Sequence, residues 1–187
     1  IEITQQFQLK CLLINSEQKE SIITLHNGNK TIYPIKIYFE KNKIIIGEEK
    51  GIEFIQDLFT NPGDFKLYDI ELYGKEYSVI AEVLFALIIS EFKEQIEKEY
   101  VIKNTIVKLP VKNLKVNSRI ITALTAIGLQ QIKLKDDKKE INFDYKAQGE
   151  ILQEIIQLKR EHSKRKRMIE RANEIAKERN ISEIKIN

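Results

Sequence analysis

The stretch Ile80–Tyr100, "IAEVLFALIISEFKEQIEKEY", determines the centre of the fold. Its apolar residues recur at intervals of three and four, which places them on one face of a helix. These residues are Val83, Leu84, Leu87, Ile88, Phe92 and Ile96. The longest uncharged apolar run, Val83–Ser90, is much shorter than the roughly 20 residues that a membrane-spanning helix needs. The stretch therefore predicts a long helix that packs on a protein core, and no membrane span is expected.

Strand-forming segments lie on both sides of this helix. Before it, "KLYDIELYGKEYSV" (66–79) predicts a hairpin that turns at Tyr73-Gly74-Lys75. After it, "NTIVKLP" (104–110) and "LQQIKL" (129–134) predict two strands. The intervening "NSRIITALTAIG" (117–128) predicts a helix with Asn117 or Ser118 as its N-cap. The strand, helix and strand from Thr105 to Leu134 predict a crossover unit, which is expected to be right-handed.

The N-terminal third is rich in short strand signals. "IEITQQFQLKCLLI" (1–14) predicts two strands joined by a turn that lacks the Gly, Asn or Asp usual in such turns. Further strand signals up to Gly47 predict an antiparallel meander. In 48–59 the spacing of Ile52, Ile55 and Phe59 predicts a helix, which "TNPGD" ends.

The C-terminal part predicts helices at Tyr145–Glu161 and Ser163–Arg179, followed by a strand, "SEIKIN" (182–187). We therefore expect an α/β protein with two parts joined near Lys135–Glu140. The first part covers residues 1–134 and the second covers 135–187.

Composition narrows the function classes. The 187 residues carry 31 basic and 28 acidic side chains, a net charge of +3, which does not indicate a nucleic-acid partner for the whole chain. The one cysteine, Cys11, has apolar neighbours and is interpreted as a core residue rather than a nucleophile. A reducing intracellular compartment is expected. His26 and His162 have no ligand residues at metal-binding spacing, so no metal site is expected.

Several motifs occur in an order that resembles a known family. "KNKIIIGEEKGIEFIQDLFTNPGDF" (41–65) resembles the strand, helix and x-N-P segment of the seventy-kilodalton heat-shock chaperones (heat shock protein 70 family). "VKLP" (107–110), "NSR" (117–119) and "AIGL" (126–129) follow in the family's order, and 141–180 is similar to the helices of its second lobe. The resemblance implies the actin-like ATPase (ribonuclease H-like) fold. That fold has two lobes, with a mixed sheet and flanking helices, and its second lobe is reduced in this chain.

The resemblance also implies that the first phosphate-binding hairpin has degenerated. The family has D-L-G-T-T there, whose glycine and hydroxyl groups surround a phosphate. In this chain Thr4 replaces the Asp, Gln6 the Gly, and Phe7 and Gln8 the two Thr. A phenylalanine at the place of the phosphate oxygens is incompatible with tight nucleotide binding.

Other nucleotide contacts of the family are also altered. In the helix that resembles E-x-A-K-R, Glu174 and Lys177 persist, whereas Glu178 stands in place of the adenine-stacking arginine. The second glycine hairpin, the segment with the catalytic lysine and the acidic residues that hold magnesium have no counterpart. The resemblance thus implies a pseudo-ATPase that needs no cofactor.

Three functions follow from these features. The first is a non-catalytic, heat-shock-70-like structural or interaction subunit of a larger assembly, with partners at Ile32–Ile46 and Ser163–Arg179. The second is a divergent ATP-binding chaperone that uses ATP and magnesium and whose missing loops lie outside this sequence. The third is an RNA-associated protein that uses the basic helix 163–179. Its basic run comprises Lys164, Arg165, Lys166 and Arg167. Glutamates on the same stretch favour a solvated amphipathic face over phosphate binding.

Overall fold

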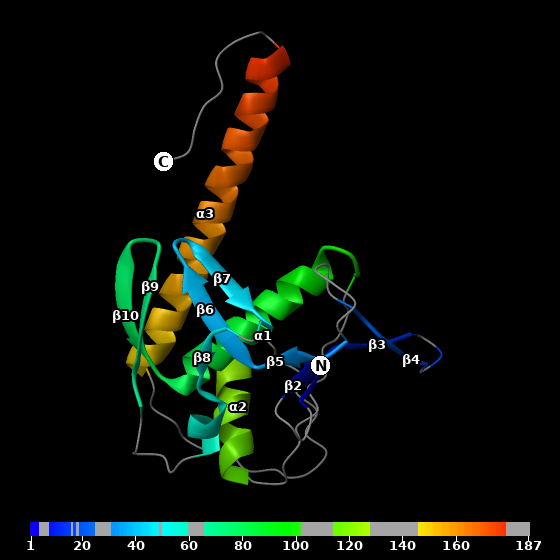
Figure 1. The fold of residues 1–187 in the computed structure, drawn as a ribbon, viewed down its shortest axis with the longest axis vertical. Coiled ribbons are helices and arrows are strands. Elements are labelled where there is room, and N and C mark those ends of the chain that lie inside the picture. Colours follow the sequence, from blue (N-terminus) through cyan, green and yellow to red (C-terminus); the bar gives the residue numbers. More distant parts are fainter. Residues whose placement is uncertain are drawn as a thin grey trace.

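The computed structural model describes residues 1–3, 8–15, 17, 19–24, 31–48, 50–59, 66–101, 114–127 and 146–178 (Figure 1). In these ranges the chain forms helices α1 (Ala81–Glu97), α2 (Leu114–Ala126) and α3 (Lys146–Glu178), the 3₁₀ helix η1 (Ile55–Phe59) and short antiparallel strands. None of the described helices has the length and apolar character needed to cross a bilayer.

Helix α1 forms the centre of the hydrophobic core, as its sequence predicts. All its residues from Ala81 to Ile89 are buried, so its first half is covered on every side rather than on one face. It contacts α2, α3, η1 and the strands β6 and β7, and Figure 1 shows it crossing the middle of the molecule. The side chains that cover it belong to one continuous core cluster.

The N-terminal strands form two small sheets. Strands β1 (Glu2–Ile3) and β2 (Gln8–Lys10) are antiparallel, with Ile3 opposite Leu9. This confirms the strand pair expected at the start of the chain, but the second strand ends at Lys10 and does not continue to Ile14. Strand β5 (Tyr33–Pro34) pairs with the other side of β2. After Cys11 the chain enters a separate hairpin of β3 (Leu12–Ile14) and β4 (Glu20–Ile22).

A third sheet has the order β7-β6-β8, formed by β6 (Lys36–Glu40), β7 (Lys43–Ile46) and β8 (Ile52–Glu53). The described strands up to Gly47 are therefore divided among three sheets, and a single meander is wrong. The helix expected at 48–59 is also wrong, because β8 precedes the short helix η1. Gly51 explains this difference: its φ is +148°, and a Cβ there would lie 3.0 Å from the Ile37 carbonyl oxygen. Only glycine allows such a close approach to β6.

The hairpin before α1 is confirmed. Strands β9 (Tyr68–Leu72) and β10 (Lys75–Val79) pair in full, and their turn places Tyr73 and Gly74 at φ of 55° and 71°. Alternate side chains of β9 are buried, which is the pattern of a strand with one face on a core.

Two helix boundaries differ from expectation. Helix α2 begins at Leu114, so Asn117 and Ser118 lie inside it and are not N-caps. Helix α3 is continuous over 33 residues instead of breaking near His162. No glycine or proline occurs between Glu150 and Glu178, so the chain contains nothing that would interrupt the helix. The strands expected at 104–110, 129–134 and 182–187 and the junction at 135–140 lie outside the described residues.

The two halves of α3 have different surroundings. In the first half, Leu152, Ile155 and Ile156 belong to the hydrophobic core. The second half extends beyond every other labelled element in Figure 1, where it is drawn from orange to red. We call residues 163–178 the arm, and the described residues up to His162 the body.

Candidate functional site

Glutamine side chains from the start of α3 complete the ends of both other helices. The Ile80 backbone N–H, which precedes α1, donates to Gln148 Oε1 at 3.0 Å, and Gln148 Nε2 donates to the Ser78 carbonyl at 3.2 Å. At the end of α2, Gln153 Nε2 donates to the Ala126 carbonyl at 2.6 Å. Helix ends leave backbone groups without intrahelical partners, so these amides fix α3 against α1 and α2.

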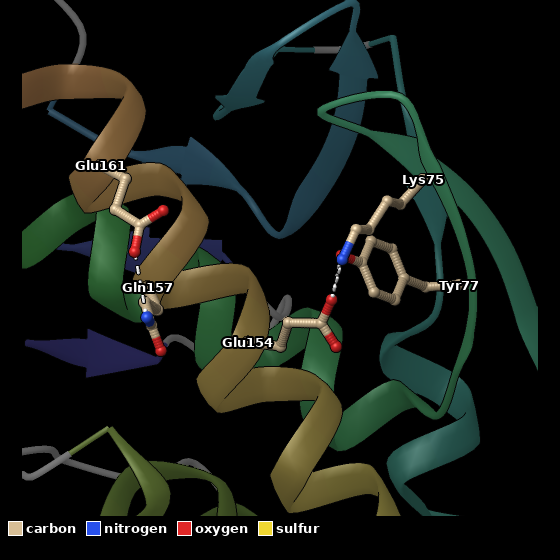
Figure 2. Close-up of polar contacts among 5 residues, drawn as sticks. All are labelled: Lys75, Tyr77, Glu154, Gln157 and Glu161. Atoms are coloured by element: carbon tan, nitrogen blue, oxygen red, sulfur yellow. Dashed lines mark hydrogen bonds and ion pairs between the residues drawn. The ribbon is translucent and has the colours of Figure 1, made fainter. Parts of the chain in front are cut away.

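The β9–β10 hairpin is joined to the same part of α3 by a carboxylate. Lys75 Nζ lies 2.7 Å from Glu154 Oε1, and the Tyr77 hydroxyl donates to the same oxygen at 3.2 Å (Figure 2). The hydrogen bond from Lys75 lowers the pKa of Glu154, and the reciprocal contact raises the pKa of Lys75. One turn further along, Gln157 bonds to Glu161 within α3.

A second charged group lies where α3 leaves the body. Lys159 forms ion pairs with Glu91 and, at 2.9 Å, with Glu94, both on α1. At the turn of the β9–β10 hairpin, the Tyr73 ring packs against the His162 ring with centroids 5.3 Å apart. Burial, with a smaller contribution from the two glutamates, raises the pKa of Tyr73 to about 12. The hairpin and α1 therefore contact α3 up to the start of the arm.

A buried ion pair joins α1 to α2. Arg119 Nε donates to Glu82 Oε1, and Arg119 Nη1 donates to the Asp57 carbonyl of η1 at 2.7 Å. Tyr68 on β9 bonds to the Asp57 carboxylate, and burial together with this contact raises the pKa of Tyr68. Within the described residues, Glu82 Oε2 has no hydrogen-bond partner. This group holds α1, α2, η1 and β9 together.

The described surface has a shallow groove of about 510 Å³ between the end of α2 and the first half of α3. Three of its polar side chains, Gln153, Glu154 and Gln157, are engaged in the contacts given above. Lys146 and Glu150 also line it. With most of its polar groups already paired, the groove offers little for a ligand to bind.

The residues that resemble nucleotide contacts do not converge. Thr4, Gln6 and Phe7 lie outside the described residues, and Gln8 is a half-buried residue of β2 opposite Pro34. Glu174 and Lys177 are exposed on the arm, and Glu178 is the last residue of α3. Figure 1 places β2 in the body and the end of α3 at the far tip of the arm. Gln8 and the arm residues therefore do not form one site in this structure.

No family model, curated protein or solved structure matches this chain. The resemblance to the heat-shock chaperones therefore stays a hypothesis that rests on the order of the motifs.

The basic run from the sequence lies entirely on the arm. Lys164, Arg165, Lys166 and Arg167 are all exposed, and Lys166 lies 3.8 Å from Glu170. The arm also exposes two large apolar side chains, Met168 (68% exposed) and Ile175 (43% exposed). Ala176, also on the arm, is buried. Among the described residues, no three His, Cys, Asp or Glu side chains are grouped to hold a metal ion.

Sequence reasoning missed the contacts that hold α3 in place and the Glu82–Arg119 pair. A usable signal existed for the pair, because Glu82 is a lone charge within the apolar run "VIAEVL" and Arg119 directly precedes the largely apolar run "IITAL". Charges that are fully buried are almost always paired. The glutamine contacts had no such signal, because glutamine is common on exposed helix surfaces.

Proposed function

We propose that this protein is a non-catalytic structural and interaction subunit of a larger protein assembly, in which the body holds the arm against a partner. The observation that carries the proposal is the position of the arm. It continues a helix whose first half is part of the core, yet it exposes Met168 and Ile175 away from that core. Met168 and Ile175 are seven residues apart and so share one side of the helix, and an apolar side of a projecting helix is a surface that a second protein can cover.

The rigidity of the attachment supports the same function. Contacts from Gln148 to His162 fix α3 to both other helices and to the β9–β10 hairpin. A helix fixed along half its length presents its remaining half in one direction. The conformational entropy of the arm is therefore already lost when the free protein folds, so binding a partner does not have to order it.

A second surface that we include in the proposal is the outer edge of β7. This strand pairs with β6 on one side, and within the described residues no strand pairs with its other side. It reads Lys-Ile-Ile-Ile, and an apolar edge of this kind pairs readily with another chain. A partner strand along β7 would satisfy its open backbone groups.

We also propose that the chain is a degenerate relative of the heat shock protein 70 nucleotide-binding domain, with the two-lobed actin-like α/β fold. The order of its motifs and the replacement of the phosphate-binding residues support this part. A titration of the protein with Mg-ATP, followed by calorimetry, is expected to give no binding. Micromolar affinity would instead support the divergent chaperone.

The interaction function is tested by photo-crosslinking in the cells that naturally contain the protein. A benzophenone amino acid at Met168 or Ile175 is expected to give the same discrete protein adduct. The matched control is Val101, which is 93% exposed on the body. If the arm positions give no adduct, or the adduct also appears from Val101, the arm is not a docking surface and the proposal fails.

A further inference from the structure

The distribution of charge along α3 is uneven. Seven basic and two acidic residues lie between Lys159 and Arg171, whereas the whole chain has a net charge of only +3. The rest of the chain is therefore slightly acidic. Such a concentration of charge on one projecting segment is a physical basis for binding a polyanion, whatever the net charge of the protein.

Four of these cations form a straight stripe. Arg160, Lys164, Arg167 and Arg171 follow one another at intervals of four, three and four residues, which keeps them on one side of a helix. All four are exposed, and none forms an ion pair with another described residue. At 1.5 Å per residue the stripe is about 16 Å long. We call these four residues the basic stripe.

The other cations of the segment differ from the stripe. Lys159 is paired with Glu91 and Glu94, and Lys166 with Glu170. Arg165 is exposed but points more than a quarter turn away from the stripe, because successive residues of a helix are rotated by about 100°. Unpaired cations are thus concentrated on one side of α3, from its last contact with the body into the arm.

We propose that the basic stripe binds the phosphate backbone of a nucleic acid without sequence preference. Three of its four side chains are arginines, whose planar guanidinium groups donate two parallel hydrogen bonds to a phosphate. Neutralising phosphates releases condensed counterions, so several contacts that are individually weak give useful affinity. The stripe is a row of evenly spaced cations without an Asn, Gln or aromatic residue among them, a composition that suits contacts to phosphates, which carry no sequence information.

An acidic protein surface is the competing ligand, and two features favour the nucleic acid. Exposed ion pairs between proteins contribute little free energy each, since no condensed counterions are released. The stripe is also straight and convex, and it suits a regular row of charges rather than a pocketed surface. The nucleic acid is a different ligand from the protein partner proposed above. Either proposal can therefore be wrong while the other is right.

The test is fluorescence anisotropy of the full chain with two probes, a labelled 20-nucleotide oligouridylate and a labelled 20-base-pair DNA duplex. Four phosphate contacts predict a slope of log K against log salt of about −3 for the single strand and about −3.5 for the duplex. The probe that binds more tightly identifies the form of the ligand. This slope needs no variant, so it tests the proposal even if a substitution disturbs folding.

Two double variants localise the binding. K164Q/R171Q removes two stripe cations and is expected to halve the slope and weaken binding on the order of tenfold at 0.1 M salt. R165Q/K166Q removes the same charge from the same helix outside the stripe, and its affinity is expected to stay within about threefold of the parent, because contacts in the stripe remain. The proposal is overturned by no binding of either probe at 50 mM salt, or by equal losses in the two variants. Equally tight binding of labelled poly-L-glutamate also overturns it and identifies an acidic protein surface.

Discussion

Arg119 on α2 donates a hydrogen bond to Glu82 on α1, and the two side chains are only 4% and 5% exposed. Glu82 lies in the first turn of α1, where the positive end of the helix dipole favours a carboxylate. The pair also reaches η1 through Arg119 and the Asp57 carbonyl. A buried charge is costly without its partner, so each residue depends on the other.

Removing one member of this pair is expected to destabilise the protein by about 3–5 kcal/mol, because the other charge stays buried and loses the opposite charge beside it. R119M and E82M each test this by urea unfolding followed by circular dichroism. The double variant E82M/R119M removes both charges and is expected to unfold at a higher urea concentration than R119M alone. A double variant whose loss equals the sum of the two single losses would show that the residues act independently.

The two halves of α3 can be compared with one residue type. Ile155 is fully buried in the core, whereas Ile175 is 43% exposed on the arm. I155A is expected to lose about 2–5 kcal/mol of unfolding free energy. I175A, the matched control, is expected to change it by less than about 0.5 kcal/mol. Similar losses in both variants would mean that the arm contributes to the core as the first half does.

Replacing glycine by alanine is expected to stabilise the protein at one position and to destabilise it at another. Gly149 lies inside α3 with no atom within 4 Å of an added Cβ, so G149A should stabilise the protein by roughly 0.5–1 kcal/mol. At Gly51 an added Cβ would approach the Ile37 backbone, and φ is +148°. G51A should therefore destabilise by more than about 1 kcal/mol. Thermal unfolding midpoints measure both, and a stabilising G51A would contradict the β8 geometry.

The Lys75–Glu154 contact predicts a pH dependence. Because the folded-state pKa of Glu154 is lowered, its contribution to stability is complete above the unfolded pKa of about 4.3 and is lost as the pH falls through the folded value. E154Q should therefore lower the melting temperature at pH 7, and this effect should shrink as the pH falls below the unfolded pKa. The control is E150Q, which makes the same change one turn earlier on α3, outside the contact with Lys75.

Cys11 should react slowly in the folded protein. Its thiol is buried, and burial raises its pKa to about 11, so little thiolate exists at pH 8. Ellman's reagent is expected to modify it at least tenfold faster in denaturing urea than in buffer. It is the only cysteine, so the whole signal comes from this site. Equal rates in the two conditions would show that the β2–β3 region is open.

The sequence predicts correctly those helices and turns whose residue pattern lies within one continuous segment. Helix α1 has a periodic apolar face over many residues, and the turn at Tyr73–Gly74 is placed by its glycine. The spacing of Ile52, Ile55 and Phe59 suits an α-helix equally well, but Gly51 joins its neighbours to β6 through a contact with Ile37. That contact is distant in sequence, so local spacing could not indicate it.

The candidate sites also depend on contacts between residues that are distant in sequence. The basic run at 164–167 is visible in the sequence, but its interpretation depends on which cations have partners. Lys159 is paired because α1 places two glutamates beside it, whereas Arg160 is not. Such differences arise from the packing of α3 on the body. The Glu82–Arg119 pair likewise joins residues 37 positions apart, and only the fold determines that they meet.

The unbroken length of α3 has a mechanical consequence. A 33-residue helix is about 50 Å long, and roughly half of it lies beyond the contact with His162. A tilt of about 10° at that contact would displace the tip by about 4 Å, given a rise of 1.5 Å per residue. Helix α3 is thus a lever, with its fulcrum at the Tyr73–His162 contact. Small shifts of the β9–β10 hairpin would be amplified at the tip, and a force on the tip would be transmitted to Lys159 and its glutamates.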